Sequence, residues 1–367
     1  MTRCHNFSAG PAALPLPVLH DLQAALVEFG DTGAGIMEIS HRSKPFEAVL
    51  ASAESRLRRL MAIPDDYVVL FLQGGASLQF YMLALNLLGD EGAAADYVVT
   101  GTWASKALKE ARRVGDARAI WDGKEVDYRR LPTDDELLVR EGSRYLHYTT
   151  NNTIYGTQFH RTPKVGVPLL ADMSSDICSR PVDTAAHDMI YAGAQKNLGP
   201  SGVTAVILSP WAQSQARQTA KVLPGGLPAM LDYGIAVDNQ SMYNTPNTFG
   251  IFALERVLAW LEGQGGLSAM EAVNRQKAER LYAEIDRSGF WKPRADTADR
   301  SWMNVAWRLP TEDLEARFVK EASAAGLKEL KGHRSAGGIR ASLYNATGLD
   351  AVDALVGFMR EFERSNG

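Results

Sequence analysis

The sequence contains few cysteines, no strong charge imbalance and no long hydrophobic run. Cys4 and Cys178 are the only cysteines among 367 residues, which suits a reducing compartment but leaves room for one disulfide. A net charge of −4 gives no reason to expect a nucleic acid or an anionic membrane as a partner. No apolar run approaches the length of a membrane span, and the N-terminus lacks the charged and apolar regions of a signal peptide. We therefore expect a cytoplasmic protein.

Two common nucleotide-binding motifs are also missing. The strand expected at residues 68–72 runs into Gln73-Gly-Gly-Ala-Ser-Leu-Gln, which is neither a G-x-G-x-x-G fingerprint nor a Walker A loop. Dinucleotide and ATP binding therefore lose support. A strand, a glycine turn and a helix still present free backbone N–H groups to a phosphate. This signal is weak by itself, because many α/β turns contain two glycines.

The first part of the chain alternates between expected strands and helices. Apolar runs predict buried strands at residues 68–72, 97–100, 117–121, 145–149, 167–171, 189–192 and 203–208. Helices are expected from Pro17 and at residues 45–61, 78–88 and 104–113. This alternation predicts an α/β fold with a mainly parallel sheet and right-handed crossovers. Ligands of such sheets bind at the carboxyl ends of the strands.

The pattern changes after Leu208, and 367 residues are enough for a second domain. Helices are expected at 250–262 and 267–287, then a half-buried strand near 302–307, a helix from Thr311, a strand at 339–343 and a last amphipathic helix. These elements predict a smaller α+β domain packed on the first. We place the large domain at 16–257 and the small domain at 258–367, with the N-terminal segment 1–15 belonging to the small domain.

Lys196 lies in a glycine-rich turn between the last two strands of the alternating part. By spacing alone, a solvated loop lysine is slightly favoured over a reactive amine. In a desolvated pocket, however, the pKa of a lysine falls and its amine can form a Schiff base with an aldehyde cofactor. Asp172 follows the preceding strand. This is the arrangement that pyridoxal phosphate needs. The acid pairs with the pyridine nitrogen, and the lysine beyond the next strand carries the aldehyde.

Other polar and aromatic residues also follow the ends of expected strands. Gly75, Trp103 and Thr153 occupy such positions, as do Asp172 and Lys196. Because the carboxyl ends of parallel strands meet at one edge of a sheet, these residues could converge on one site. With seven tryptophans in the chain, Trp103 alone would be interpreted as a core residue.

Taken together, the motifs resemble one family, the phosphoserine aminotransferases, which are pyridoxal phosphate enzymes of fold type I. The similarity runs nearly end to end, and each block alone is only a moderate signal. The blocks that carry it are Asn6–Pro11, Met37–Ser43, Gly74–Phe80, Asn151–Thr157, Ala171–Ser175, Tyr191–Asn197, Tyr243–Phe249, Lys331–Arg334 and Gly337–Ser342. All of them in this order are very specific. The resemblance implies a large domain with a mainly parallel, seven-stranded sheet.

The resemblance also implies roles around the cofactor ring. Lys196 would hold the aldehyde and then move a proton between the amino-acid carbon and the cofactor carbon. Asp172 would pair with the pyridinium and keep the ring an electron sink. Trp103 would stack on the ring face, and Thr153 would contact the ring edge near the phenolic oxygen.

The cofactor phosphate would be bound by residues from two subunits. The resemblance implies that Ala76 and Ser77 bind it through backbone N–H groups, with Gln195 beside them. Asn244 and Thr245 would reach the cofactor phosphate of the neighbouring subunit, which makes the active unit a homodimer. Some family members carry an arginine where this chain has Ala76-Ser77, which puts in doubt only the details of the phosphate contacts.

Two His-Arg pairs carry the substrate interpretation. By spacing alone, His41-Arg42 and His333-Arg334 would be solvated surface charge. By resemblance they bind the substrate's phosphate, for which a guanidinium fork is well suited, and Arg42 also binds the glutamate side-chain carboxylate. Arg340 would bind the α-carboxylate, and Ser8 would lie near the bound amino acid. No metal ion is expected.

The family's reaction is the reversible conversion of 3-phosphooxypyruvate and L-glutamate into O-phospho-L-serine and 2-oxoglutarate, in serine biosynthesis. Formation of 4-phosphooxy-L-threonine for pyridoxine biosynthesis stays open as a second activity. Another aminotransferase or a cysteine desulfurase of the same fold is the nearest alternative, but neither cysteine obviously serves a desulfurase. A non-catalytic cofactor sensor fused to a DNA-binding module is the other alternative. It is disfavoured because the matched motifs begin at Asn6.

Overall fold

The computed structural model describes residues 3–89 and 92–367, and its central feature is a seven-stranded sheet. The strands follow the spatial order β2 (Val68–Leu72), β8 (Thr204–Leu208), β7 (Met189–Gly193), β6 (Leu169–Asp172), β5 (Ser143–Thr149), β3 (Ala94–Val99) and β4 (Asp116–Asp122). Neighbouring strands from β7 to β4 are parallel, whereas β8 is antiparallel to both β7 and β2. The predicted α/β fold with a mainly parallel sheet is therefore confirmed.

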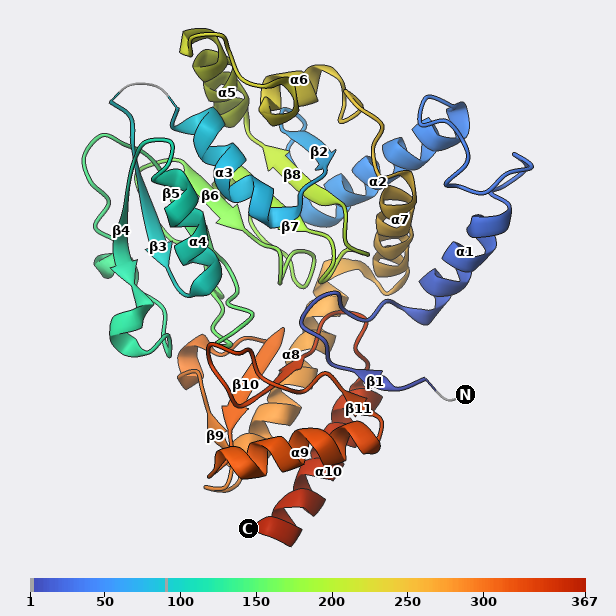
Figure 1. Ribbon diagram of the computed structural model, residues 1–367, viewed down its shortest axis with the longest axis vertical. Helices are drawn as coiled ribbons and strands as arrows, with labels where there is room; N and C mark the ends of the chain where they lie inside the picture. The colour runs from blue at the N-terminus through green and yellow to red at the C-terminus, as the bar shows by residue number, and fades with distance from the viewer. Residues whose placement is uncertain (1–2, 90–91) are drawn as a thin grey trace.

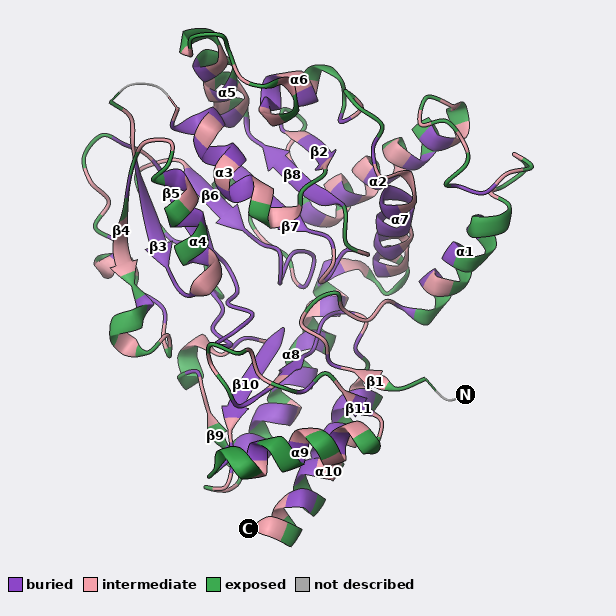
Figure 2. Ribbon diagram, viewed as in Figure 1, coloured by how far each residue is buried: buried purple, intermediate pink, exposed green. Residues whose placement is uncertain are grey.

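Helices cover both faces of this sheet, as Figure 1 shows. One face packs against α2 (Lys44–Met61) and α7 (Thr248–Gly263), with α1 (Leu16–Val27) outside them. The other packs against α3 (Gly75–Leu87), α4 (Thr102–Ala111), α5 (Pro210–Val222) and α6 (Tyr233–Asp238). The chain therefore buries its strands on both sides, except at the edge strand β4 (Figure 2).

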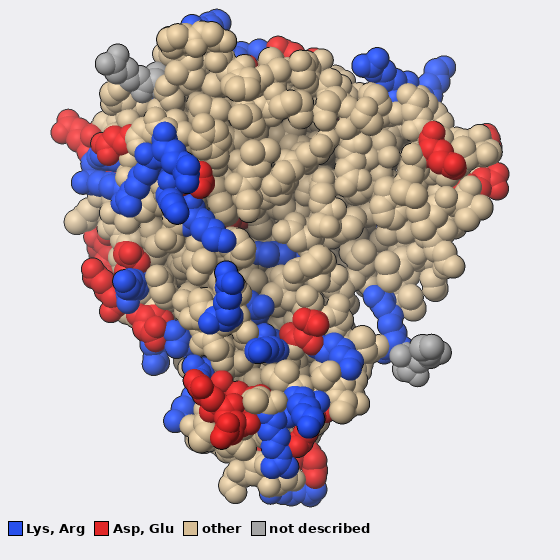
Figure 3. Space-filling model, in the orientation of Figure 1, with Lys and Arg blue, Asp and Glu red and all other residues tan. Residues whose placement is uncertain are grey.

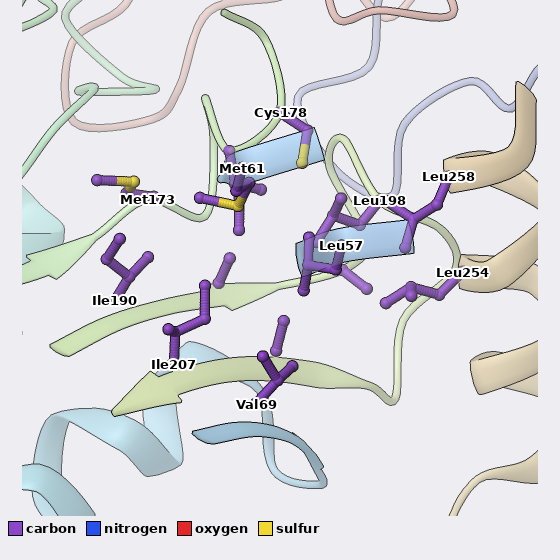
Figure 4. Packing of buried hydrophobic residues seen from close by; sticks show 14 of the residues in the cluster. Leu57, Met61, Val69, Met173, Cys178, Ile190, Leu198, Ile207, Leu254 and Leu258 are labelled. Carbon is purple, nitrogen blue, oxygen red and sulfur yellow. The ribbon is translucent and has the colours of Figure 1, made fainter. Parts of the chain in front are cut away.

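Side chains that alternate along each strand supply the two hydrophobic cores. Ile190 of β7 and Ile207 of β8 point to the same face, where Leu57 of α2 and Leu254 of α7 meet them (Figure 4). Tyr191, the next residue of β7, belongs to the core on the other face. A strand buried on both faces reads as a continuous apolar run, which is why the apolar runs of the sequence predicted these strands.

The C-terminal part is a smaller α+β unit below the sheet in Figure 1. It contains α8 (Gly266–Asp286), β9 (Lys292–Pro293), β10 (Asn304–Arg308), α9 (Glu312–Ala324), β11 (Leu327–Lys328), β12 (Ile339–Ser342) and α10 (Leu349–Asn366). Strands β12, β10 and β9 form an antiparallel sheet in that order. The N-terminal strand β1 (His5–Asn6) pairs in parallel with β11, so the N-terminal segment lies on this part.

The predicted domain limits remain a prediction. Residue 258, the expected boundary, lies inside α7, which is continuous from Thr248 to Gly263. Residues 1 and 2 of the expected segment 1–15 lie outside the described residues. Short 3₁₀ helices occur at Gly123–Val126, Asp134–Glu136, Thr184–Ala186, Ala229–Leu231 and Thr297–Asp299.

Two helices begin earlier than predicted. Helix α3 starts at Gly75 instead of Leu78, and α4 starts at Thr102 instead of Ala104. In the sequence, the glycines at these positions predicted a loop instead of the first turn of a helix. The left-handed conformation that turns the chain is, however, confined to Gly74 and Gly75, with φ of +90° and +64°. Ala76, Ser77 and Trp103 therefore lie in first helical turns.

Strand β10 is not half-buried, as its alternation predicted, because its polar face is also covered. Asn304 is fully buried; its Oδ1 accepts a hydrogen bond from Asn151, which follows β5, and its Nδ2 donates one to Ser342 of β12. These bonds satisfy its amide without water. The face expected to meet solvent instead meets the large sheet's loops.

Within the described ranges, the structure contains no helix that is long and apolar enough to cross a membrane.

Candidate active site

Lys196 lies in the turn between β7 and β8, at the edge of the sheet that faces the C-terminal part. Its Nζ donates a hydrogen bond to Thr153 Oγ1 over 2.9 Å and lies 5.7 Å from the centre of the Trp103 ring. Burial lowers the pKa of Lys196 to about 8, against the opposing effect of the Asp172 carboxylate. The predicted lysine is thus a half-buried amine of reduced basicity.

Asp172 is the last residue of β6, and its carboxylate is buried beside Lys196. Burial raises the pKa of Asp172, while Lys196 and two hydrogen bonds from Ser174 oppose the rise. Both bonds end on Oδ1, from the Ser174 backbone N at 2.9 Å and from its Oγ at 2.6 Å. The other oxygen, Oδ2, has no hydrogen-bond partner among the described residues, so it can accept from a cationic nitrogen.

Thr153 is presented by a tight turn that Asn152 holds. The Asn152 side-chain oxygen accepts from the backbone N of Ile154 at 3.0 Å and of Tyr155 at 3.2 Å. Its amide nitrogen donates to the Thr100 carbonyl, directly before Gly101. A Cβ on Gly101 would lie 2.3 Å from this nitrogen, so the close approach requires glycine there.

Trp103 lies in the first turn of α4, where its ring meets two lysine ammonium groups. The centre of the ring is 4.6 Å from Lys106 Nζ and 5.7 Å from Lys196 Nζ. The indole Nε1 is buried and has no hydrogen-bond partner in the described part of the chain. A tryptophan of the apolar core would not face charged groups in this way, which supports a role in the site.

The N-terminus of α3 offers backbone donors at the same edge of the sheet. Helix α3 follows β2, whose carboxyl end lies on the same side as those of β6 and β7. The backbone N–H groups of Ala76 and Ser77 lie in its first turn and make no hydrogen bond to the described residues. Free N–H groups at a helix N-terminus form an anion site.

Gln195 and the N-terminal loop lie against Lys196. The backbone oxygen of Gln195 accepts from Ala12 N over 2.9 Å, and a Cβ on Gly10 would lie 3.2 Å from Lys196 Cγ. Ser8, in the same loop, accepts from Gly10 N through its Oγ at 3.4 Å. Gly10 of this loop therefore lies against Lys196, while the roles expected for Ser8 and Gln195 remain predictions.

The C-terminal part adds cations on the opposite side of Lys196. Arg340 of β12 donates through Nη1 to the Thr153 carbonyl over 3.3 Å, and its charge lowers the pKa of Lys196. Burial lowers the pKa of His333, with further contributions from Arg340, Arg334 and Lys106. His333 and Arg334 lie on the turn that precedes β12, the strand that carries Arg340.

The other predicted residues are not joined to this cluster within one chain. His41 and Arg42 lie in the connection between α1 and α2, which Figure 1 draws at the outer edge of the molecule. Asn244 and Thr245 are exposed, and the Thr245 carbonyl accepts from Gln73 Nε2 over 3.1 Å, beside the turn into α3. No contact with Lys196 or Asp172 is present for these four residues in the described structure.

Three residues of the site were not predicted from the sequence. Ser174 holds Asp172, and the Asp-x-Ser spacing is the signal that could have indicated it, since such side chains bond the backbone two residues on. Asn152 is likewise the first residue of a turn of this kind. Lys106 is three residues after Trp103, so a helix brings the two side chains to one face.

Comparison with known proteins yields close matches over the whole chain. The family model for class-V aminotransferases matches residues 4–355. A phosphoserine aminotransferase from Geobacillus kaustophilus is 52% identical over 365 residues, which are 99% of each chain. The solved phosphoserine aminotransferase from Bacillus circulans subsp. alkalophilus is 48% identical, with a TM-score of 0.94 over 100% of this chain and 99% of that one. The pyridoxal phosphate-bound structure of phosphoserine aminotransferase from Trichomonas vaginalis is 37% identical, with a TM-score of 0.91 over 98% and 100%.

Proposed function

Because the chain belongs to the class-V aminotransferase family and is a pyridoxal phosphate-dependent transaminase, we propose that one of its two amino-acid substrates carries a phosphate group. The enzyme interconverts O-phospho-L-serine and 2-oxoglutarate with 3-phosphooxypyruvate and L-glutamate. The observation that carries this proposal is that Lys196 and Arg340 both donate hydrogen bonds to Thr153, while His333 and Arg334 lie on the turn that precedes the strand of Arg340. Relatives about half identical over their full length bear the name of this activity.

The residues around Lys196 fit pyridoxal phosphate. The amine suits the aldehyde, the free Asp172 Oδ2 suits the pyridine nitrogen, and the Trp103 ring offers an aromatic face. The free N–H groups at the start of α3 suit the phosphate. When bound, this cofactor would supply an electron sink for the electron pair that stays on the substrate's α-carbon when its proton is removed.

The proton transfer is assigned to Lys196. A pKa of about 8 leaves part of the amine neutral near neutral pH, so that Nζ can take the proton from the α-carbon and return it. Thr153 Oγ1, at 2.9 Å, fixes the direction of the amine. Asp172 supplies the negative charge that keeps a ring nitrogen protonated. Both substrates use this site in turn, in a ping-pong scheme.

Substrate recognition is assigned to the arginines of the C-terminal part. Arg340 is held by the Thr153 carbonyl next to the amine, where it can bind the α-carboxylate that every amino-acid substrate carries. His333 and Arg334 lie on the turn that precedes β12 and would bind the phosphate. Such a site favours phosphoserine over serine because only the former carries a dianion.

The site is completed by a second copy of the chain. His41-Arg42 and Asn244-Thr245 lie on loops that do not reach the Lys196 cluster of their own chain. In a homodimer they serve the partner subunit, the first pair at the substrate phosphate and the second at the cofactor phosphate. The proposed location is the cytoplasm, and it is supported by both cysteines being free thiols.

Replacement of Arg334 by alanine tests the substrate assignment. Loss of one charge-assisted phosphate contact should cost about 1.5–3 kcal/mol, so kcat/KM for phosphoserine should fall about 10- to 100-fold. In Arg334→Ala, kcat/KM for glutamate should change little. In Arg340→Ala, kcat/KM should fall for both phosphoserine and glutamate. Arg317→Ala, which removes an exposed arginine of α9 that pairs with Glu321, is the matched control. Equal losses for both substrates in Arg334→Ala would remove Arg334 from the phosphate site.

A further inference from the structure

Lys106, in the large part of the chain, has no acidic partner among the residues that the structure describes. It lies on α4 one turn after Trp103, and its side chain is exposed. Its ammonium is 4.6 Å from the centre of the Trp103 ring, and it forms no ion pair with the described residues. An exposed lysine usually extends into water or meets a carboxylate, whereas this one lies against the aromatic face of the site.

Lys106 is connected to the Lys196 cluster through Trp103. Trp103 contacts both Lys106 and Lys196. Thr153 accepts from Lys196 through its side chain and from Arg340 through its carbonyl. The charges of Arg340 and Lys106 both reach His333. Lys106 therefore lies, through Trp103, beside the residues that hold Lys196 and Arg340.

The charges around Lys106 and the turn of His333 are mostly positive. The positive charges of Arg340, Arg334 and Lys106 all lower the pKa of His333, whereas Glu312 and Glu315 of α9 line the pocket on the other side of the His333 turn. Asp172 is the one carboxylate assigned to the site, and it lies beside Lys196 at the sheet. Figure 3 shows lysine and arginine side chains gathered over α4 and over the facing edge of the C-terminal part. A dianion placed between these surfaces would be attracted from both sides.

We propose that Lys106 binds the substrate's phosphate from the large part of the chain, opposite His333 and Arg334. This inference rests on the proposed phosphoserine activity and adds a binding residue that neither His-Arg pair supplies. A lysine suits this position because its long stem lets a compact charge move from the Trp103 ring to the incoming phosphate. Glutamate, which carries a single negative charge at the corresponding end, gains less from this contact.

Lys106→Met tests the inference, because methionine keeps an apolar contact with Trp103 but removes the charge. The kcat/KM for phosphoserine should fall by about tenfold, as expected for one solvent-accessible charge-assisted contact, with glutamate within about twofold of the wild type. The inhibition constant of inorganic phosphate, used as a competitive inhibitor, should rise by a similar factor. Lys106→Arg should restore most of the phosphoserine activity. Lys109→Met, one turn further along α4 and exposed, is the matched control.

Two results would overturn the inference. If Lys106→Met lowered kcat/KM equally for phosphoserine and glutamate, the role of Lys106 would be limited to supporting Trp103. If Lys106→Met behaved like Lys109→Met, Lys106 would have no part in binding. Failure of the proposed function gives a different result, since the wild-type enzyme itself would then show no preference for phosphoserine over serine.

Discussion

At the scale of the residue, the chemistry depends on an amine that is less basic than that of an ordinary lysine. Burial lowers the pKa of Lys196 to about 8 because the ammonium loses its water, and Asp172 limits the fall. At pH 7.5 such an amine is roughly one quarter neutral, against about 0.1% for an unperturbed lysine. The structure therefore prepares the nucleophile before any ligand arrives.

The pH dependence of Lys196 modification follows from this pKa. In the cofactor-free protein, the rate of reductive methylation at Lys196, followed by mass spectrometry of its peptide, should reach half its maximum at about pH 8. Asp172→Asn removes a negative charge that favours the ammonium, so its midpoint should move to lower pH. A midpoint near that of an ordinary lysine, or one that Asp172→Asn leaves unchanged, would contradict the assignment.

The sequence was sufficient to predict Lys196 and Asp172 as residues that lie together, but not the residues that hold them. Lys196 and Asp172 were predicted because their order along the strands reflects a known chemical requirement. Ser174 and Asn152 act through hydrogen bonds within turns, to Asp172 and to the backbone around Thr153. Serine and asparagine are common in turns, and only the coordinates show which of them carry such bonds.

At the scale of the element, the alternation of strands and helices was predictable and the ends of the elements were not. The antiparallel direction of β8 could not be predicted, because an apolar run looks the same in either direction. Residues 209–249 received no predicted element, although α5 begins with a clear signal. Ser209 accepts from Ala212 N, and Pro210 occupies the first turn.

The turn that carries Thr153 depends on the glycine before α4. A Cβ added at Gly101 would overlap the Asn152 amide at 2.3 Å, so Gly101→Ala should displace the Thr153 turn from Lys196. We expect kcat to fall by about tenfold or more, since misplaced catalytic groups cost this much. Gly263→Ala, at the end of α7 where an added Cβ meets nothing within 4 Å, is the control. Equal kcat values for the two variants would show that the turn tolerates the shift.

At the scale of the whole molecule, the two parts of the chain supply different functions. The sheet and its helices carry Lys196, Asp172 and the donors at the start of α3, while the C-terminal part carries Arg340 and the His333 turn. The sequence could not predict how these parts meet, because the joining contacts pair residues such as Thr153 and Arg340 that are 187 positions apart. The proposed contribution of His41-Arg42 extends this division to a second subunit.

Hybrid dimers test whether two chains share a site. A Lys196→Ala chain and an Arg42→Ala chain, each impaired as a homodimer, are unfolded together and refolded to mix their subunits. If Arg42 serves the partner's Lys196, each hybrid dimer contains one wholly wild-type site. Phosphoserine turnover should then rise well above that of either homodimer, toward one wild-type site per hybrid. Turnover no higher than the sum of the separate homodimers, in a sample shown to contain hybrids, would place Arg42 in the site of its own chain.

The preference for phosphoserine over serine is the most direct test of the central claim. The measurement is kcat/KM for both amino donors with 2-oxoglutarate and the purified enzyme. Two or more charge-assisted contacts to the phosphate, each contributing about 1.5–3 kcal/mol, predict a preference of at least about a hundredfold for phosphoserine. Comparable values for the two donors would mean that the cations around His333 do not recognise the phosphate, and the proposed function would be wrong.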